Sequence, residues 1–417
     1  MKRFSGTGAA RVAGALLFFV MYAPAAGAAT ITVNCDMGEL LQAAIDGACS
    51  GDRITVTGTC NEAVIIGFEP VGCNMPPTPN TPFQNLSISG RSGKKGATGT
   101  TIEGVGGPAI TVNSNAIRIS IKGLTVGSDT DHGIAILSAH RVTLTNIRTP
   151  SPLATPLGGD GVNVDTLSTN TKLTSSTLNG NGGDGVEMGA TNGSINNVTA
   201  NDNMEAGIHV TGDNVKVERC TAHNTATLPA QQVGFQVDGA TAVIQKSIAQ
   251  NNTVAQYHNT LASRGVILFR NTAGDSRVTV APASGKGVWE QGSGNYISNF
   301  TVTRNGGDGV HLAGDGNQLQ RSSVFGNVGA QVRVEGDRNL LTSVSATRLG
   351  PGDPFQSVVP AYNVMAGSQA NFFIRTNASV DGTAVVGDGF SIPDLTTTGE
   401  RNTRRPTVVG DPPAALK

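Results

Sequence analysis

Short stretches in which apolar and polar residues alternate recur along the chain, each about as long as a β-strand. Residues 158–164, 182–188 and 306–312 carry the same pattern, Gly-Gly-Asp-Gly followed by an apolar, a polar and an apolar residue. A turn rich in Gly, Asp and Asn follows each copy, and then a second alternating stretch begins. Alternation with period two is typical of strands that bury one face. The repeated unit therefore predicts short strands joined by tight turns.

The spacing of these units predicts how the strands are arranged. The steps from Glu187 to His209, from Trp289 to His311 and from His311 to Arg333 are 22 residues each, and wider steps fit the same unit carrying an insertion. Repetition at this period is typical of solenoids. Two or three strands per unit, with turns too short for helices, favour an all-β parallel β-helix in which each strand pairs with its copy one coil away.

Asparagine turns and a helical N-terminal cap complete the pattern. Asn203, Asn252, Asn305 and Asn327 end the second strands, and residues 37–48 carry apolar residues at helical spacing. A short helix over the first coil would cover its unpaired strand edge. With these features the chain, over residues 30–392, resembles the right-handed parallel β-helix proteins of the pectin lyase-like superfamily. That resemblance implies the fold, and it leaves function open because the superfamily includes pectate lyases, polygalacturonases, uronan epimerases and members without known activity.

The N-terminus predicts export. Lys2, Arg3 and Arg11 precede an apolar run over residues 12–22 and an Ala-Gly-Ala site, the order of a secretory signal peptide. We expect cleavage after Ala28 and a secreted or periplasmic protein. Removal of residues 1–28 leaves 26 basic and 30 acidic residues, a formal net charge of −4. That balance argues against nucleic acid or an anionic membrane as a partner, and we expect a monomer.

The cysteines agree with an oxidising compartment. Cys35, Cys49, Cys60 and Cys73 form an even set near the start of the mature chain, so we expect two disulfides, with all three pairings open. Zinc binding is the rival interpretation, but no Cys-x-x-Cys spacing is present. Cys220 falls at an inward position of its unit and is expected to be a buried free thiol.

The remaining segments define the expected domain organisation. Residues 29–85 would form the disulfide-linked cap and first coils, with 72–82 as a proline-rich loop. Residues 86–395 would form the β-helix. Residues 396–417 carry three prolines and no strand pattern, and we expect a flexible tail.

Candidate chemistry lies on the outward positions of the first strand in each unit. Stacking turns these positions into one column of neighbours about a strand spacing apart. In order, the column reads Ala135, Asn163, Glu187, His209, Gln236, His258, Trp289, His311, Arg333 and Asn363. Two residues further along, Asp165 and Asp238 also face outward. Three of the six histidines and the single tryptophan fall in this column.

Carboxylates and imidazoles at this range can act as general acid and base, and an indole ring can stack on a sugar. We expect His209 or His258 to abstract a proton next to a uronate carboxyl group, Glu187 to orient the imidazole, and Trp289 to stack on a neighbouring sugar. The substrate-binding residues expected beside this catalytic set are Asn163, Asp165, Gln236, Asp238, Trp289, His311 and Arg333. Insertions at 149–157, 225–232 and 349–360 enter before this strand and would form a wall beside the column.

Structural roles compete with these interpretations. Asp160, Asp184 and Asp308 stand next to glycine and favour turn formation over catalysis. A calcium site is conceivable through Asp160, Asp165 and Asp184, but no cofactor is required by the sequence. The sequence lacks the ordered motifs of polygalacturonases, and Asp129-Thr130-Asp131-His132 matches the epimerase Asp-Pro-His-Asp signature incompletely.

The sequence thus predicts an exported β-helix protein that engages an extracellular polysaccharide along its first sheet. Lyase, epimerase or hydrolase chemistry on uronate-containing glycans is the expected reaction. The alternative is a non-catalytic surface or matrix protein whose rigid rod is its function.

Overall fold

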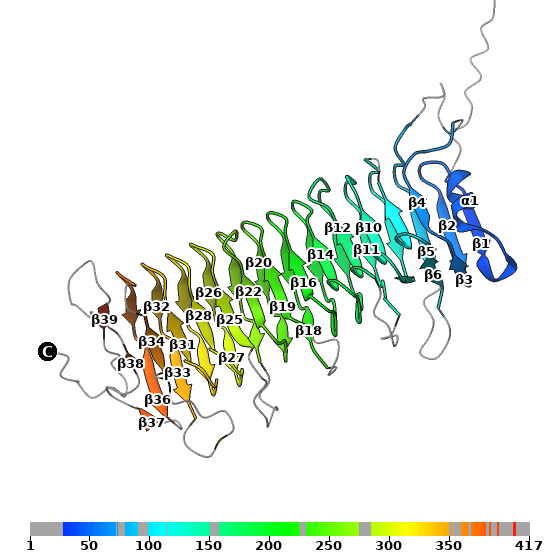
Figure 1. The fold of residues 1–417 in the computed structure, drawn as a ribbon. Coiled ribbons are helices and arrows are strands. Elements are labelled where there is room, and N and C mark those ends of the chain that lie inside the picture. Colours follow the sequence, from blue (N-terminus) through cyan, green and yellow to red (C-terminus); the bar gives the residue numbers. More distant parts are fainter. Residues whose placement is uncertain are drawn as a thin grey trace, which may run out of the picture.

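The chain winds into an elongated stack of coils whose strands lie side by side from one coil to the next (Figure 1). This architecture is seen in a computed structural model. The structure describes residues 28–71, 73, 80–90, 99–113, 115–150, 158–225, 231–274, 285–349, 353, 359, 361–365, 368–380, 383–384, 390–391 and 403–405. The predicted signal peptide, the loop tips at 151–157 and 226–230, and most of 350–360 lie outside these residues.

A 13-stranded parallel sheet carries the predicted column, and we call it the column sheet. Its strands, from the N-terminal end of the stack, are β4 (Val64–Ile66), β7 (Ile110–Val112), β10 (Ile134–Ile136), β12 (Val162–Val164), β14 (Val186–Met188), β16 (Ala206–Val210), β19 (Val233–Val237), β22 (Ala255–Asn259), β25 (Lys286–Glu290), β28 (Val310–Leu312), β31 (Val332–Val334), β34 (Tyr362–Val364) and β38 (Phe390–Ser391).

A 15-stranded parallel sheet follows the column sheet within each coil, and we call it the second sheet. It contains β1 (Thr30–Asn34), β2 (Arg53–Thr57), β5 (Ser87–Gly90), β8 (Ser120–Lys122), β11 (Thr143–Thr145), β13 (Lys172–Thr174), β15 (Ser194–Asn196), β17 (Lys216–Glu218), β20 (Val243–Gln245), β23 (Ile267–Phe269), β26 (Tyr296–Ser298), β29 (Gln318–Gln320), β32 (Leu340–Thr342), β35 (Phe372–Ile374) and β39 (Thr403–Arg405).

The third side of the stack is built from two shorter sheets. One contains β3 (Thr59–Asn61), β6 (Thr101–Gly104) and β9 (Thr125–Ser128), and the other contains β18 (Thr221–His223), β21 (Ile248–Gln250), β24 (Thr272–Ala273), β27 (Thr301–Thr303), β30 (Ser323–Phe325), β33 (Ser345–Arg348), β36 (Asn377–Val380) and β37 (Thr383–Ala384). Single parallel bridges through Arg148, Thr177 and Thr199 connect β9 to β18, so this side continues along the stack. Only β36 and β37 pair in antiparallel fashion among the paired strands described.

Alternation along each strand explains the core. In β12 the side chains of Val162 and Val164 are buried while Asn163 is half-buried, and β14 repeats the pattern around Glu187. Stacking these inward residues produces one continuous core of Val, Ile, Leu and Ala with few large rings. Because burial of each apolar side chain removes surface from water, this shared core stabilises coils that could not fold alone.

Buried amides hold the turns in register. Asn181 Nδ2 donates to Asn203 Oδ1 at 2.7 Å, and Asn305 Nδ2 donates to Asn327 Oδ1 at 2.9 Å. The repeated glycines make room for this arrangement. A Cβ on Gly185 would lie 2.6 Å from a backbone oxygen of the next coil and 2.7 Å from Asn203 Nδ2. The asparagines therefore have the turn-forming role that the sequence predicts.

The N-terminal end is capped as expected, with a shorter helix. A 3₁₀ turn, η1 (Cys35–Met37), precedes α1 (Leu41–Asp46), which buries Leu41 and Ile45. The expected helix over 37–48 is therefore reduced to six residues. Leu40, one of the apolar residues in the expected helix, is 59% exposed because it precedes the helix.

The cysteines pair as two disulfides, Cys35–Cys60 and Cys49–Cys73, which confirms their number and resolves their pairing. Cys220 is a buried free thiol, as predicted, and burial raises its pKa to about 12. Among the described residues, no helix is both long and apolar enough to cross a membrane.

The C-terminal segment differs from expectation. Residues 396–417 were expected to contain no strand, yet β39 pairs in parallel with β35 at the end of the second sheet. A polar edge strand needs backbone pairing with a neighbour rather than an apolar face, and its sequence therefore lacks the alternation used to predict the other strands.

Candidate functional site

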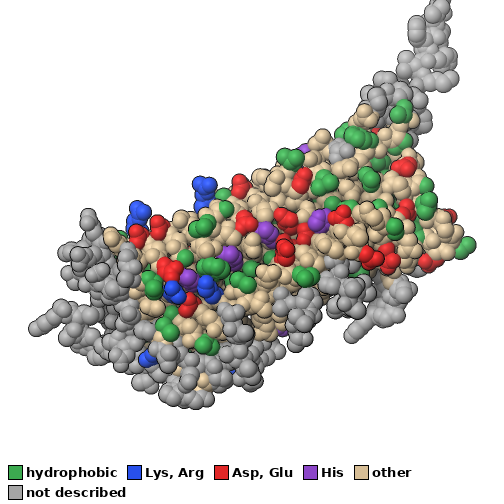
Figure 2. All heavy atoms as spheres, in the orientation of Figure 1, with side chains coloured by type: hydrophobic (Ala, Val, Ile, Leu, Met, Phe, Trp, Pro, Cys, Tyr) green, Lys and Arg blue, Asp and Glu red, His purple; other side chains and the backbone are tan. Residues whose placement is uncertain are grey.

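The outward column is assembled in the predicted order. In the column sheet Asn163 pairs with Glu187, Glu187 with His209, and His209 with Gln236. The register continues through His258, Trp289, His311, Arg333 and Asn363. Figure 2 shows histidine and acidic side chains following one another along the long axis of one face. Sequence repetition alone was sufficient to place these neighbours.

The aspartates of the Gly-Gly-Asp-Gly repeats connect one coil to the next. Asp160 Oδ1 accepts the backbone N–H of Asp184 at 2.7 Å, Asp184 Oδ1 accepts that of Ala206 at 2.7 Å, and Asp308 Oδ1 accepts that of Ala330 at 2.9 Å. Their predicted role was a turn within their own coil. The structure corrects this: one carboxylate oxygen reaches the following coil, and the other oxygen remains directed at the column.

His209 is clamped between two carboxylates. Its Nδ1 lies 3.0 Å from Asp184 Oδ2 and its Nε2 lies 2.7 Å from Asp238 Oδ2. The amide nitrogen of Gln236 lies 3.2 Å from the same Nε2. Glu187 is hydrogen-bonded to Asn163 and not to the ring, so the expected orientation of His209 by Glu187 is wrong. The orienting groups are Asp184, which we had treated as a turn residue, and Asp238.

This clamp determines the charge of His209. Burial disfavours the ionised ring, but hydrogen bonds to Asp184 and Asp238 outweigh burial and raise the pKa of His209 to about 10. The ring is therefore an imidazolium at neutral pH, with both nitrogens protonated. In this state His209 cannot accept a proton, which contradicts its expected role as a general base.

Glu187 and Asp238 lie on the coils before and after the coil of His209, and the pKa values of their carboxyl groups are shifted in opposite directions. Burial raises the pKa of Glu187, with further contributions from Asp160 and Asp184 that the opposing influence of His209 does not cancel. Burial also acts on Asp238, but hydrogen bonds from His209 and Thr260 lower its pKa to about 2. Such a divergence between neighbouring carboxyl groups is typical of acid and base pairs in hydrolases.

Asn163 and Asp165 have different environments. Asn163 Nδ2 donates to Glu187 Oε2 at 2.7 Å and to Asp160 Oδ2 at 2.8 Å, so it holds Glu187 in place. Asp165 accepts hydrogen bonds from Ser168 N at 2.9 Å, Ser168 Oγ at 2.6 Å and Ser138 N at 2.9 Å. With both oxygens bound to its own and a neighbouring turn, Asp165 stabilises the turn, and its geometry does not support the expected contact with substrate.

Aromatic rings stack in the next part of the column. The rings of His258 and Trp289 are 4.5 Å apart, those of Trp289 and His311 are 6.4 Å apart, and both pairs are nearly parallel. The ammonium of Lys286 lies 3.7 Å from the centre of the Trp289 ring. Protein groups therefore occupy the faces of Trp289, which differs from the expected stacking of this ring on a sugar.

The two histidines of this part are neutral at pH 7. Burial lowers the pKa of His258, and Gln291 Oε1 lies 2.8 Å from its Nε2, which assigns the proton to Nε2 and a lone pair to Nδ1. Burial also lowers the pKa of His311, whose Nε2 lies 2.9 Å from Glu335 Oε2 without the alignment of a hydrogen bond. His258, unlike His209, could therefore accept a proton.

The expected basic end of the column is neutralised by acids. Arg333 forms an ion pair with Glu335 and lies 3.9 Å from Asp308 Oδ2. We call Asn163, Glu187, His209 and Gln236 the acidic half, together with their aspartates. We call His258, Trp289, His311 and Arg333 the ring half. Glu187, His209 and His258 are neighbours along one column but do not form the single hydrogen-bonded cluster that the sequence interpretation implied.

The acidic groups do not assemble a calcium site of the kind considered above. Asp165 does not join Asp160 and Asp184 in one ligand set. Within the described ranges, the one group of acidic, histidine or cysteine side chains close enough to share an ion is Cys35, Cys60 and Glu62. Its cysteines form a disulfide, so the residues present do not fit a metal ion.

The loops expected to wall the column have tips outside the described residues. The described flanks of the 149–157 insertion agree with the expected point of entry. Arg148 and Thr149, before the loop tip, belong to the third side, and β12, after it, is a strand of the column sheet. The further residues that sequence reasoning missed are Asp184, Gln291 and Lys286. Spacing places Asp184 three residues before the column position Glu187, but the direction of its carboxylate toward the next coil depends on the turn and does not follow from the sequence.

Comparison with known proteins agrees with this geometry. A family model for the right-handed β-helix region matches residues 86–254. The chain is a right-handed parallel β-helix protein. This fold is the one that the repeats and the resemblance described above led us to expect. The sequence matches none of the curated proteins with which it was compared.

Two solved structures illustrate the likeness of the β-helix. The mannuronan C-5 epimerase AlgE6 A-module of Azotobacter vinelandii is 14% identical, with a TM-score of 0.51, over 92% of this chain and 100% of that one. DFA-IIIase from Arthrobacter chlorophenolicus A6, without its lid and in complex with GF2, is 12% identical, with a TM-score of 0.52, over 87% of this chain and 92% of that one. At these identities the comparison establishes the fold alone.

Proposed function

We propose that the column sheet binds an extracellular polysaccharide along the stack axis and hydrolyses it at the acidic half. The observation that carries this proposal is the divergence in pKa between Glu187 and Asp238 on either side of a charged His209. The fold supports it, because the two neighbours described above are named for carbohydrate reactions. The two disulfides fit the exported location that the N-terminus predicts.

In this proposal Glu187 is the general acid. Its raised pKa keeps a proton available for the glycosidic oxygen, and Asn163 fixes the carboxyl group. Asp238 remains ionised and faces the sugar as the partner carboxylate, which directs a water molecule to the anomeric carbon and accepts its proton. His209 is a positioning residue that holds Asp238 through Nε2.

The separation of the pair predicts the stereochemistry. Glu187 and Asp238 lie two coil steps apart, since Glu187 pairs with His209, which pairs with Gln236. Two strand spacings combined with the offset of two residues from Gln236 to Asp238 amount to roughly 12 Å between backbones. The Asp238 carboxylate reaches back toward Glu187, since its Oδ2 lies 2.7 Å from His209 Nε2. This spacing leaves room for a water molecule between carboxylate and sugar, so we expect inversion at the anomeric carbon.

The charge of the site indicates the class of glycan. The acidic half holds four carboxyl groups, those of Asp160, Asp184, Glu187 and Asp238, and one imidazolium, so it would repel a polyuronate. A neutral polysaccharide is therefore the favoured substrate. This differs from the sequence interpretation, in which uronate-containing glycans were the expected class.

A screen of the purified protein against neutral and uronate polysaccharides tests the proposal. New reducing ends from a neutral polymer, lost in Glu187→Gln and in Asp238→Asn, are the expected result. Unsaturated products absorbing in the ultraviolet would instead support an elimination with His258 as base. Binding without any product would support the non-catalytic alternative.

A further inference from the structure

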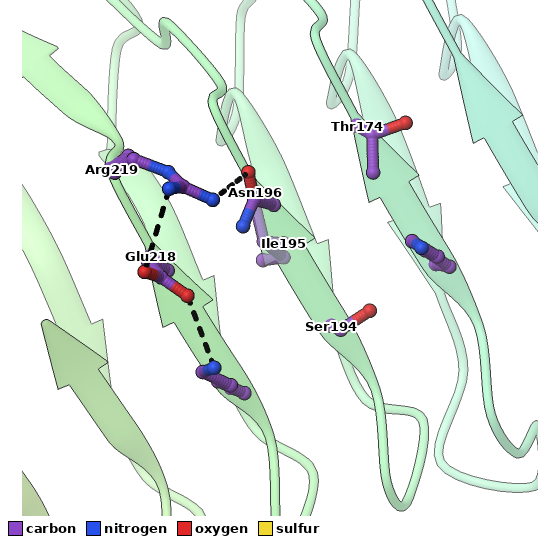
Figure 3. A pocket seen from close by; sticks show the side chains of 8 residues that line it. Thr174, Ser194, Ile195, Asn196, Glu218 and Arg219 are labelled. Carbon is purple, nitrogen blue, oxygen red and sulfur yellow. Dashed lines mark hydrogen bonds and ion pairs between the residues drawn. The ribbon is translucent and has the colours of Figure 1, made fainter.

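A second polar surface lies on the second sheet, away from the column. There a cleft of about 400 Å³ crosses β13, β15 and β17. It is lined by Lys172, Thr174, Ser194, Ile195, Asn196, Lys216, Glu218 and Arg219. Figure 3 shows Arg219 reaching across to Asn196 on the neighbouring strand, with Glu218 directly beneath its guanidinium. None of these residues belongs to the column.

Positive charge dominates this cleft. Glu218 is the one acidic residue in its lining, and its carboxylate lies 3.0 Å from Lys216 Nζ, 3.0 Å from Lys246 Nζ and 3.8 Å from Arg219. Hydrogen bonds from Lys216 and Lys246 lower the pKa of Glu218 to about 2. Lys172 adds a fourth cation. One carboxylate therefore contacts several cations and cannot neutralise them all. The cleft is locally positive although the formal net charge of the whole chain is −1.

The cations extend beyond the cleft as a row along the stack. The residue that follows each strand of the second sheet occupies one turn position, and five cations share it. We call these the basic ridge: Arg219, Lys246, Arg270, Arg321 and Arg375. Arg219, Lys246 and Arg270 stand on three consecutive coils, joined by backbone hydrogen bonds from each to the strand residue beside the next. All five side chains are exposed.

The turn itself does not call for cations. All five ridge residues adopt positive φ, between 46° and 56°. Asn146, Asn197 and Asn299 occupy the same position on other coils with the same conformation. Asparagine tolerates this conformation with less strain than arginine or lysine. Since asparagine satisfies the same turn on other coils, the turn alone does not account for the row of cations.

We propose that the basic ridge and its cleft bind an extended, carboxylated polysaccharide along the stack axis. Consecutive coils place one cation about every 4.8 Å, the spacing of paired strands. That interval is comparable to the length of one sugar residue, so a polymer with one carboxylate per sugar matches the row in charge and in period. The hydroxyl and amide groups of Thr174, Ser194 and Asn196 in the cleft supply hydrogen bonds to sugar hydroxyls. This surface is independent of the proposed hydrolysis.

Charge reversal on the ridge tests this inference. Arg219→Glu, Lys246→Glu and Arg270→Glu are combined in one variant. Arg118→Glu, Arg141→Glu and Arg338→Glu form the matched control, since these arginines are also exposed, also adopt positive φ and change the net charge equally. Binding of both variants and the native protein to polygalacturonate is measured at several salt concentrations, with thermal unfolding as a check on folding.

We expect the native protein to bind polygalacturonate with an affinity that falls as salt rises. The ridge variant should bind about tenfold or more weakly, and the control variant within about twofold of the native protein. A milder variant, with glutamine at the three ridge positions, should show an intermediate loss if the reversed one unfolds.

Three results would overturn the inference: no binding by the native protein, equal losses in both variants, or tighter binding of single-stranded DNA or dextran sulfate, which carry no carboxylates, than of polygalacturonate. Loss of binding in Glu187→Gln instead of the ridge variant would assign the polymer to the column. Hydrolysis of a neutral glycan by the ridge variant at the native rate is expected in every case, so the two proposals fail separately.

Discussion

The acidic half and the ring half of the column differ in how they hold histidine. His209 lies between two carboxylates and is charged. His258 lies between a ring and an amide, His311 lies beside a ring and the single carboxylate of Glu335, and both are neutral. All three stand at the same position of the same repeat, on coils that pair in the same register. The comparison teaches that the repeat determines where a side chain lies, whereas its neighbours on the adjacent coils determine its chemistry.

The largest expected difference between the two halves is the effect of a Glu→Gln substitution on the rate of polysaccharide hydrolysis. We expect Glu187→Gln to reduce the rate of polysaccharide hydrolysis by about a hundredfold to ten-thousandfold, the range for loss of a general acid. Glu335→Gln, the same change in the ring half, should reduce the rate by less than about tenfold. Initial rates at saturating substrate measure both. Equal losses would mean that the acidic half has no special role.

The charge on His209 predicts a pH dependence of stability. Because the pKa of His209 is raised to about 10, the folded state holds a proton above pH 6.5 that the unfolded state has lost. Its stabilising contribution is complete below pH 6.5 and is lost as pH rises to about 10. The difference in unfolding free energy between the native protein and His209→Gln should therefore shrink by on the order of 3 kcal/mol across this range.

Chemical denaturation at a series of pH values measures that difference. Matched substitutions, His258→Gln and His311→Gln, should show no such decline above pH 6.5, because burial lowers the pKa of both histidines. A flat difference for His209→Gln would show that Asp184 and Asp238 do not hold a charged ring.

A buried carboxyl group beneath the ring half predicts the opposite response to mutation. Glu290 is fully buried, and burial raises its pKa to about 8 despite hydrogen bonds from Asn259 and Asn295. Between pH 4.5 and 8 the unfolded state ionises and the folded state does not, so stability falls as pH rises. Glu290→Gln removes this loss and should stabilise the protein by roughly 2 kcal/mol at pH 8.

The same variant should be close to neutral at pH 4.5, where Glu290 is protonated in the folded state. Asn259 Oδ1 is buried without a partner and could accept a hydrogen bond from the new amide after a flip of its side chain. Thermal unfolding at both pH values distinguishes this outcome from a general packing effect, which would be equal at the two.

The smallest expected effect concerns the stacked rings. Lys286→Met removes the ammonium above Trp289 and should cost about 0.5–1 kcal/mol of stability, the usual size of a cation–π contact. Because Trp289 is the single tryptophan, its fluorescence reports on this position alone. We expect a shifted emission maximum in Lys286→Met and none in Lys246→Met, whose ammonium contacts Glu218 instead.

Repetition explains how much of this the sequence could predict. The column from Asn163 to Arg333 follows from counting residues, because each coil must dock on the preceding one. The partner of His209 could not be read in the same way. Asp184 lies on the preceding coil and outside the alternating strand. Its carboxylate contacts the next coil from a turn, and the shape of that turn does not follow from the repeat length. The disulfide pairing was equally open, since spacing permits all three arrangements.

The double use of Asp184 joins the proposed site to the contact between two coils. One oxygen of its carboxylate accepts a hydrogen bond from the backbone of the following coil, and the other oxygen contacts the imidazolium of His209. A force that pulls the stack lengthwise, such as tension in a polymer fixed at two points of the rod, would act on the junction that positions His209. Tension along the rod would therefore reach the proposed site through this one side chain.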